Sequence, residues 1–341
     1  MKKIAVLAAG HGLNDCIAGY ILGNLVSMGL PLFDAGMAIF IYNLIAFGGQ
    51  MVFAVLAKYK PFPKFWLLLC YAFLAGGMLL LHSNYQLSVW LVAFSSMIIH
   101  VIGGHESSAN EKQASALGIF AAPGVIGLIL GGWLAFIHYD LMWTGIAGCA
   151  VLAVATFFLR FSAAAEAPEE KSGADRHDVI MIVLLAVISL RSAIWDVFQL
   201  LYENRYDILL PVAIAAMAGK ITGGFLGDRI GHRRQSIWAL SLSLPLLSFN
   251  RQNIPLLCTG IFLLQSSLPN LSRLLINQLR SDRHMGAALT FGLPIILGAL
   301  FFFSPLKTYA DSTLAIVLLH LLCLLLLFLL GRKKKAAALQ S

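Results

Sequence analysis

Residues 224–234 read Gly224-Phe225-Leu226-Gly227-Asp228-Arg229-Ile230-Gly231-His232-Arg233-Arg234, and they lie between two apolar segments. Glycines at this spacing allow a tight turn and a close approach of two helices. Asp228 can pair with basic residues or with a helix N-terminus, where the backbone dipole favours an anion. An ordinary basic loop is the alternative interpretation. The acid, the bases and the glycines together favour a helix–loop–helix corner.

The whole chain is strongly apolar. Of its 341 residues, 59% are hydrophobic and 12% are charged, and the mean hydropathy is +0.83. A soluble domain carries about 25% charged residues, because its surface must be hydrated. The composition therefore predicts an integral membrane protein, whose exterior is solvated by lipid. The net charge of +8 does not indicate a nucleic-acid partner, because the basic residues form short clusters between apolar segments.

A membrane-spanning helix needs about 20 mostly apolar residues. The candidate spans are residues 4–28, 35–57, 65–82, 87–104, 114–137, 141–161, 179–202, 208–227, 235–249, 254–279, 286–304 and 311–331. Segment 235–249 is short, so ten or eleven spans are the alternatives to twelve. We expect the first segment to be retained rather than cleaved as a signal peptide, because polar residues interrupt it.

The basic residues predict that both termini are cytoplasmic. In that orientation, eighteen of the 24 Lys and Arg residues lie in cytoplasmic segments and three lie in the opposite loops. The other three, Arg191, Lys220 and Arg273, lie inside spans. Cytoplasmic loops are enriched in these residues, and the short loops favour a bacterial inner (plasma) membrane.

A polar stretch divides the predicted spans into two equal sets. The predicted organisation is an N-terminal six-helix half at 1–161, a cytoplasmic linker at 162–178, a C-terminal six-helix half at 179–331 and a basic cytoplasmic tail at 332–341. Two equivalent halves are the layout of many secondary transporters.

The 224–234 motif resembles the Gly-x-Leu-x-Asp-Arg-x-Gly-x-Arg-Arg signature of the major facilitator superfamily. The resemblance implies an all-α integral membrane fold, with two six-helix bundles (about 12 transmembrane helices) around a central cavity. It also implies a gating motif made of Gly224, Gly227, Asp228, Arg229, Gly231, Arg233 and Arg234. The equivalent loop of the first half, residues 57–64, lacks the acid and the glycines, so a symmetric latch is not expected.

Shorter pieces are similar to the fosmidomycin-resistance type of efflux protein. These are His11-Gly12-Leu13-Asn14-Asp15 and the Lys60-Pro61-Phe62-Pro63-Lys64 turn. The fifth span, with Pro123-Gly124 among several glycines, loosely resembles the pattern of drug/proton antiporters, although the usual Gly-Pro order is inverted. These pieces imply drug-resistance efflux by antiport.

Ionisable side chains inside spans are costly and face a partner or an aqueous cavity. His11, Asn14 and Asp15 share one helical face, at positions i, i+3 and i+4. An acid beside an imidazole can exchange a proton near neutral pH, so Asp15, His11 and His100 are the candidate proton-coupling residues. The alternatives are a local pairing of Asp15 and a structural interhelical role for His100.

A second polar set is predicted to bind substrate. Its members are Asn14, Arg191, Asp196, Gln199, Asn270 and Arg273. Arg191 and Asp196 are five residues apart and point in different directions, so Arg191 needs another anion, either Asp15 or the substrate. The two arginines favour an anionic or strongly polar solute.

The sequence thus predicts a proton-coupled secondary active transporter that works by alternating access and exports a small drug-like or anionic metabolite. Uptake of a small organic anion by proton symport is the main alternative, and a membrane-embedded enzyme acting on lipid is a distant one. The expected partners are the bilayer, a small solute and protons, and the expected state is a monomer. The residue spacing indicates no catalytic residue, cofactor or metal site, and the five cysteines are scattered.

Overall fold

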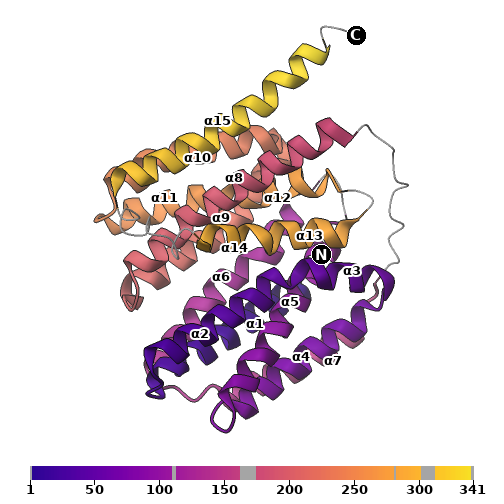
Figure 1. The fold of residues 1–341 in the computed structure, drawn as a ribbon, viewed down its shortest axis with the longest axis vertical. Coiled ribbons are helices and arrows are strands. Elements are labelled where there is room, and N and C mark those ends of the chain that lie inside the picture. The colour runs from indigo at the N-terminus through magenta and orange to yellow at the C-terminus, as the bar shows by residue number, and fades with distance from the viewer. Residues whose placement is uncertain (1, 110–112, 162–173, 280–281, 301–311, 339–341) are drawn as a thin grey trace. The chain divides into compact units, whose positions relative to one another are not determined.

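The computed structural model describes residues 2–109, 113–161, 174–279, 282–300 and 312–338 (Figure 1). Within these residues every regular element is a helix, as predicted. The first eight are α1 (Lys2–Ser27), α2 (Leu32–Asn43), the π-helix η1 (Leu44–Gly48), α3 (Gln50–Tyr59), α4 (Pro63–Leu80), α5 (Tyr85–Ser107), α6 (Ser115–Phe136) and α7 (Met142–Phe157). The others are α8 (Ala174–Leu201), α9 (Tyr206–Ile230), α10 (His232–Phe249), α11 (Ile254–Ser266), α12 (Leu268–Ile276), α13 (Arg283–Phe291), α14 (Leu293–Leu300) and α15 (Thr313–Ala338).

Helices lie at all twelve predicted spans. Among the described residues, nine helical segments are long and apolar enough to cross a membrane, and α7 is a shorter apolar helix. The doubtful segment 235–249 belongs to α10, an 18-residue helix that begins with His232 and two arginines. Predicted span 286–304 falls on α13 and α14, and its last residues lie outside the described part of the chain.

The helices form two compact units. Unit 1 contains residues 1–110, 119–165 and 282–293, and unit 2 contains residues 111–118, 166–281 and 294–341. The first turn of α6 thus belongs to unit 2, and α13 belongs to unit 1. In unit 1, α4 packs against α5 and α7, and in unit 2, α15 packs against α8 and α10 (Figure 1). The predicted functional division at 162–178 stays a prediction, and residues 162–173 lie outside the described part.

Helix α15 shows how these helices are solvated. Leu314, Leu318, Leu321 and Leu325 lie on one face and are 49–66% exposed. On the opposite face Ile316, His320, Cys323 and Leu327 are fully buried. The polar atoms of His320 are bonded, because Nδ1 contacts the Ile316 carbonyl oxygen at 2.8 Å and Nε2 contacts Ser243 Oγ at 3.2 Å. A leucine stripe on the outside and a satisfied histidine on the inside fit a helix whose outer solvent is lipid.

Helices α1 and α6 of unit 1 approach each other closely at their glycines. A Cβ atom added at Gly127 or Gly131 of α6 would collide with the backbone carbonyl oxygens of Gly12 and Cys16. A Cβ at Gly19 of α1 would collide with the Leu128 carbonyl oxygen. Small residues at such crossings let two backbones approach within a membrane, where lipid tails supply no hydrophobic drive for association.

Gly131→Ala is expected to lower the melting temperature of the detergent-solubilised protein by several degrees. The new Cβ meets the Cys16 carbonyl oxygen, which is a backbone atom and cannot rotate away. Overpacking of this kind costs about 1–3 kcal/mol. Thermal unfolding followed by circular dichroism measures the change. Gly36→Ala is the control, because no atom lies within 4 Å of its Cβ position, and an equal loss in both variants would contradict the packing argument.

Candidate functional site

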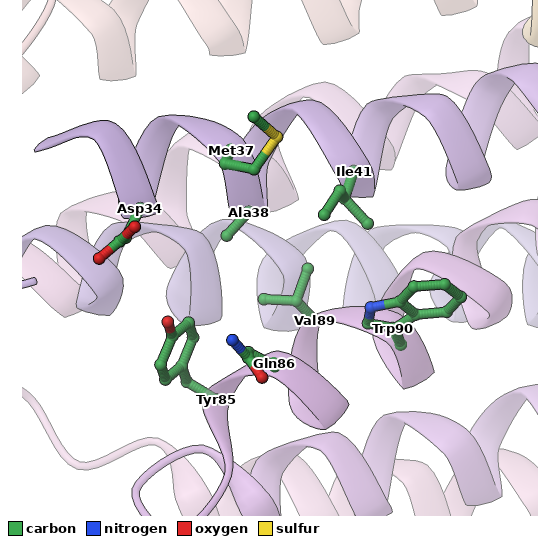
Figure 2. Close-up of a pocket in the computed structure, with 8 residues that line it drawn as sticks. All are labelled: Asp34, Met37, Ala38, Ile41, Tyr85, Gln86, Val89 and Trp90. Carbon is green, nitrogen blue, oxygen red and sulfur yellow. The ribbon is translucent and has the colours of Figure 1, made fainter. Parts of the chain in front are cut away.

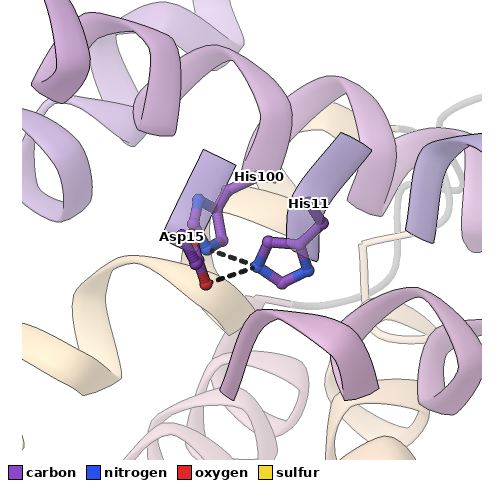
Figure 3. A group of neighbouring side chains, drawn as sticks. All are labelled: His11, Asp15 and His100. Carbon is purple, nitrogen blue, oxygen red and sulfur yellow. Dashed lines mark hydrogen bonds and ion pairs between the residues drawn. The ribbon is translucent and has the colours of Figure 1, made fainter. Parts of the chain in front are cut away.

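The candidate proton-coupling residues lie together inside unit 1 (Figure 3). His11 and Asp15 come from consecutive turns of α1, and Nε2 of His11 lies 3.2 Å from Oδ2 of Asp15. His100 comes from α5, and its Nε2 atom lies 3.1 Å from Nε2 of His11. Both histidines are buried, and the Asp15 side chain is 16% exposed. The shared helical face of His11 and Asp15 was visible in the sequence, but the direct contact with His100 was not.

The backbone fixes which ring nitrogens carry hydrogen. Nδ1 of His11 lies 2.9 Å from the Phe120 carbonyl oxygen, and Nδ1 of His100 lies 2.6 Å from the Ser96 carbonyl oxygen. A carbonyl oxygen only accepts, so both Nδ1 atoms donate and Nε2 of each neutral ring is an acceptor. Two Nε2 atoms and a carboxylate oxygen therefore converge within 4.8 Å as three acceptors. These three acceptors repel one another, and a cation bound between them, in the simplest case a proton, removes that repulsion.

A network of polar side chains orients Asp15. Nδ2 of Asn14 donates to Oδ1 of Asp15 at 2.9 Å and to Oγ of Ser96 at 2.8 Å. Oγ of Ser95 donates to Oδ1 of Asn14 at 2.8 Å, and the Tyr42 hydroxyl contacts Ser96 Oγ at 2.8 Å. Because Oδ1 is held by Asn14, the other carboxylate oxygen is left to face His11. Asn14 is fully buried, and these contacts favour a positioning role over the predicted substrate contact.

Aromatic rings surround the two histidines. The Phe120 ring stacks on His11 with a centroid distance of 4.7 Å, and the Phe47 and Phe291 rings lie 5.6 Å and 6.5 Å from the His100 ring. Such rings exclude water and strengthen the electrostatic interactions within the cluster. Sequence reasoning identified none of Ser95, Ser96, Tyr42, Phe120 and Phe291, because none carries a charge that is costly in a membrane.

Helix α8 carries three of the predicted substrate residues. Arg191 is 3% exposed, whereas Asp196 and Gln199 are half-buried. Among the described residues, Nε and Nη2 of Arg191 and Oδ2 of Asp196 have no hydrogen-bond partner. Arg191 and Asp196 are not bonded to each other there, as their five-residue spacing predicted. A buried guanidinium with two unsatisfied donors is costly unless an anion binds it.

Asn270 and Arg273 of α12 are occupied within unit 2. Nδ2 of Asn270 donates to the Gly223 carbonyl oxygen and to Gln235 Oε1, both at 2.8 Å, and Oδ1 contacts His232 Nδ1 at 3.0 Å. Arg273 donates to the Gln113 carbonyl oxygen from Nε at 3.1 Å and from Nη2 at 2.6 Å. These contacts favour a structural role for both residues, and we do not include them in the proposed substrate site.

Asp228 binds the first turn of α6. Oδ1 accepts from the backbone amide of Ala114 at 2.6 Å, and Oδ2 accepts from that of Ser115 at 3.2 Å. A Cβ at Gly224 would lie 2.7 Å from Ser115 Cα, so glycine permits this approach. The carboxylate thus satisfies amides that a helix N-terminus leaves without partners, and it complements the helix dipole. Of the two partners considered for Asp228 from the sequence, the structure shows the helix N-terminus.

The rest of the 224–234 motif shapes the corner between α9 and α10. Gly227 leaves no room for a side chain beside Asn270, and Gly231 has φ of +93°, where other residues are strained. Nε of Arg233 donates to the Leu327 carbonyl oxygen at 2.9 Å, and the Arg234 guanidinium lies 4.7 Å from the Trp238 ring centroid. Arg229, in the last turn of α9, places a cation where the helix dipole favours it.

In unit 1, the start of α13 has an acid that also pairs with a lysine. Asp282 accepts from the Met285 amide at 2.9 Å, which caps the helix, and it also accepts from Lys58 Nζ at 3.0 Å. Next to it, His284 stacks on His105 with a ring-centroid distance of 3.9 Å. Burial, and then the neighbouring His105, lower the pKa of His284 to about 4, so this ring is neutral at physiological pH. The last turn of α3 thus supplies a cation near the start of α13, whereas the 224–234 motif supplies an acid at the start of α6.

Solved structures with similar folds were found along nearly the whole chain. The major facilitator superfamily transporter FucP in the outward conformation is similar with a TM-score of 0.71 and 13% identity, over 97% of this chain and 98% of that one. The fold is decided by that coverage. The chain has the major facilitator fold.

Two further major facilitator structures are similar over as much of the chain. A variant of the E. coli fucose:proton symporter FucP has a TM-score of 0.65 and 15% identity, over 97% of this chain and 96% of that one. The human organic anion transporter MFSD10 (TETRAN) has a TM-score of 0.61 and 13% identity, over 96% of this chain and 99% of that one. No protein-family profile matches the sequence, and no curated protein sequence matches it significantly.

A pocket elsewhere in the major facilitator fold is a weaker candidate for solute binding. Its volume is about 90 Å³, and it lies between α2 and α5 (Figure 2). The lining residues are Asp34, Met37, Ala38, Ile41, Tyr85, Gln86, Val89 and Trp90. Pockets for drug-sized ligands measure about 300–1,000 Å³, so this one is too small.

Asp228→Asn is expected to lower the melting temperature of the solubilised protein. The amide keeps the size of the side chain but loses the charge that binds the Ala114 and Ser115 amides, at a cost of about 1–2 kcal/mol. Asp34→Asn is the control, because Asp34 is an exposed acid in the first turn of α2. Equal melting temperatures for wild type and Asp228→Asn would contradict the assigned contact.

Proposed function

We propose that this chain is a proton-coupled secondary active transporter that works by alternating access in a bacterial inner membrane, with both termini in the cytoplasm. It exports a small drug-like or anionic metabolite. The observation that carries the proposal is the convergence of His11, His100 and Asp15 as three acceptors inside a membrane helix bundle. The major facilitator fold, which is shared with proton-coupled and anion transporters, supports it.

The cluster has two charge states that suit a coupling site. With one shared proton, the negative charge of Asp15 is balanced and the site is neutral. Without the proton, the carboxylate faces two imidazole lone pairs, and the buried charge is costly. The conformational change that shifts access to the cluster from one face of the membrane to the other is therefore easier with a compensating charge present. This is the condition for coupling a gradient to transport.

Arg191 supplies the recognition of an anion. Its buried Nε and Nη2 donors have no partner among the described residues, and a carboxylate or phosphonate group accepts two parallel bonds from a guanidinium. The proposed substrate is therefore a small solute with an anionic group.

Proton symport for uptake of a small organic anion is the second candidate function. The similarity to FucP, which is described as a fucose:proton symporter, favours it, because the same fold and the same type of coupling serve uptake there. Export and uptake use the same cluster, and they differ only in whether proton and solute share a half-cycle.

Asp15→Asn is expected to abolish transport driven by a pH gradient, with at least a tenfold loss of initial rate, because the amide cannot exchange a proton. The measurement is flux of radiolabelled anions, including phosphonates, into and out of proteoliposomes with an imposed pH gradient, with chelator present. Exchange of solute at equal pH should continue. The control is Asp178→Asn, an exposed acid on α8. Undiminished gradient-driven flux in Asp15→Asn would remove the proton assignment.

Arg191→Gln is expected to raise KM for the transported anion about tenfold or more, since it removes a charge-assisted bond to the substrate. Arg191→Lys should be intermediate, because lysine keeps the charge but loses the bidentate geometry. The same proteoliposomes measure both, and the growth of an efflux-deficient bacterium on toxic phosphonates tests the direction of transport. An unchanged KM in both variants would show that Arg191 does not contact substrate.

A further inference from the structure

The atoms that converge in unit 1 are also spaced as the ligands of a metal ion. Two ligands bound to one ion at about 2.0–2.1 Å, with angles near 90–110°, lie roughly 3.0–3.4 Å apart. Nε2 of His11 lies 3.1 Å from Nε2 of His100 and 3.2 Å from Oδ2 of Asp15. All three atoms lie within 4.8 Å of one another, so a rotation of the partly exposed Asp15 carboxylate completes the set.

The bonds behind the cluster are those of a metal site. Histidines that bind metals usually donate their second ring N–H to a backbone carbonyl or a carboxylate, which fixes the tautomer and the ring orientation. Here both Nδ1 atoms donate to backbone carbonyls, those of Phe120 and Ser96. Oδ1 of Asp15 is likewise held by Asn14. Each lone pair that a cation needs is therefore already directed into the cluster.

Gly124 of α6 brings its backbone against two of the three ligand atoms. A Cβ atom added there would lie 2.5 Å from Asp15 Oδ2 and 2.5 Å from His11 Nε2, with His11 Cε1 at 2.6 Å. Only glycine therefore fits here without displacing two of the three ligand atoms. The adjacent Pro123 lies inside α6 and has no backbone N–H to donate to the helix.

The donor set selects the type of ion. Two imidazole nitrogens and one carboxylate oxygen suit divalent first-row metals such as Zn²⁺, Co²⁺, Ni²⁺ or Fe²⁺, whereas Mg²⁺ and Ca²⁺ prefer oxygen ligands. Three protein ligands also leave at least one coordination position for water or solute. The distance along the chain between Asp15 and His100 explains why residue spacing did not indicate this site.

We propose that His11, Asp15 and His100 form a binding site for a divalent first-row transition-metal ion, which takes the place of the shared proton. The inference rests on the proposed function in one respect, because both assign a cation to the same three side chains. One metal ion enters as one proton leaves, and the cluster changes from neutral to a single positive charge. Metal and proton compete, so binding weakens as the pH falls.

Titration of the purified full-length protein in detergent with Zn²⁺, followed by calorimetry, tests the site. We expect one ion per chain, with release of about one proton measured from buffers of different ionisation enthalpy. Asp15→Asn, His100→Gln and Gly124→Ala should each raise Kd at least tenfold. His82→Gln is the control, because His82 is exposed, and its Kd should match that of the wild type.

A second measurement needs no variant. Co²⁺ bound to two imidazoles and a carboxylate in a four-coordinate site gives strong visible d–d absorption, and Zn²⁺ should displace it stoichiometrically. Equal Zn²⁺ affinity in wild type and the three variants, or no Zn²⁺ binding at millimolar concentration by folded wild type, overturns the metal site.

The metal site and the proposed function fail separately. Proton-driven flux is measured with chelator present, and metal binding is measured without a gradient. If Zn²⁺ does not bind but the flux still depends on Asp15, only the metal site is wrong. If Zn²⁺ binds with the expected variant profile but the flux does not depend on Asp15, only the proton-coupling proposal is wrong.

Discussion

The close approach of α1 and α6 is the constraint on which the cluster depends. In a membrane, helices gain little from burying apolar side chains against one another, because lipid is equally apolar. Their association must come from backbone proximity and polar contacts, and the glycines at 19, 127 and 131 provide the proximity. That approach brings the Phe120 carbonyl oxygen to His11 Nδ1, and this bond decides which nitrogen faces Asp15 and His100. A backbone packing requirement thus determines the chemistry of a side-chain site.

Polar groups buried in a bilayer have no water with which to form hydrogen bonds, so each bond in the cluster restricts the others. Asn14 can hold Asp15 only because Ser95 and Ser96 satisfy the rest of its amide. His100 keeps its orientation through the Ser96 carbonyl oxygen, one helical turn earlier on α5. Since α1 and α5 are tied through these few atoms, a change in charge at Asp15 reaches both helices directly.

The sequence predicted the helical segments and the composition of the cluster, but not which neighbours each polar residue contacts. Apolar runs and the 224–234 motif were sufficient for the fold, and the i, i+4 spacing was sufficient to pair His11 with Asp15. Asn270 and Arg273 are predicted to contact solute, and that role stays a prediction; their described contacts are with backbone carbonyls and neighbouring side chains. A polar stripe on a helix has the same pattern whether it faces a cavity or another helix, because periodicity gives direction but not the identity of the neighbour. For the same reason, the sequence did not predict that Ser95, Tyr42 and Gly124 belong to the cluster, because their part in it depends on the residues opposite them.

The two helix-terminus contacts share a dependence on dissolved salt. Asp228 is exposed, and the side chains of Lys58 and Asp282 are 39% and 23% exposed. Counterions therefore reach both acids, and a rise in ionic strength weakens the electrostatic attraction in both contacts. The hydrogen bonds that Asp228 and Asp282 accept from backbone amides remain when that attraction is screened, so salt weakens the starts of α6 and α13 without removing either cap.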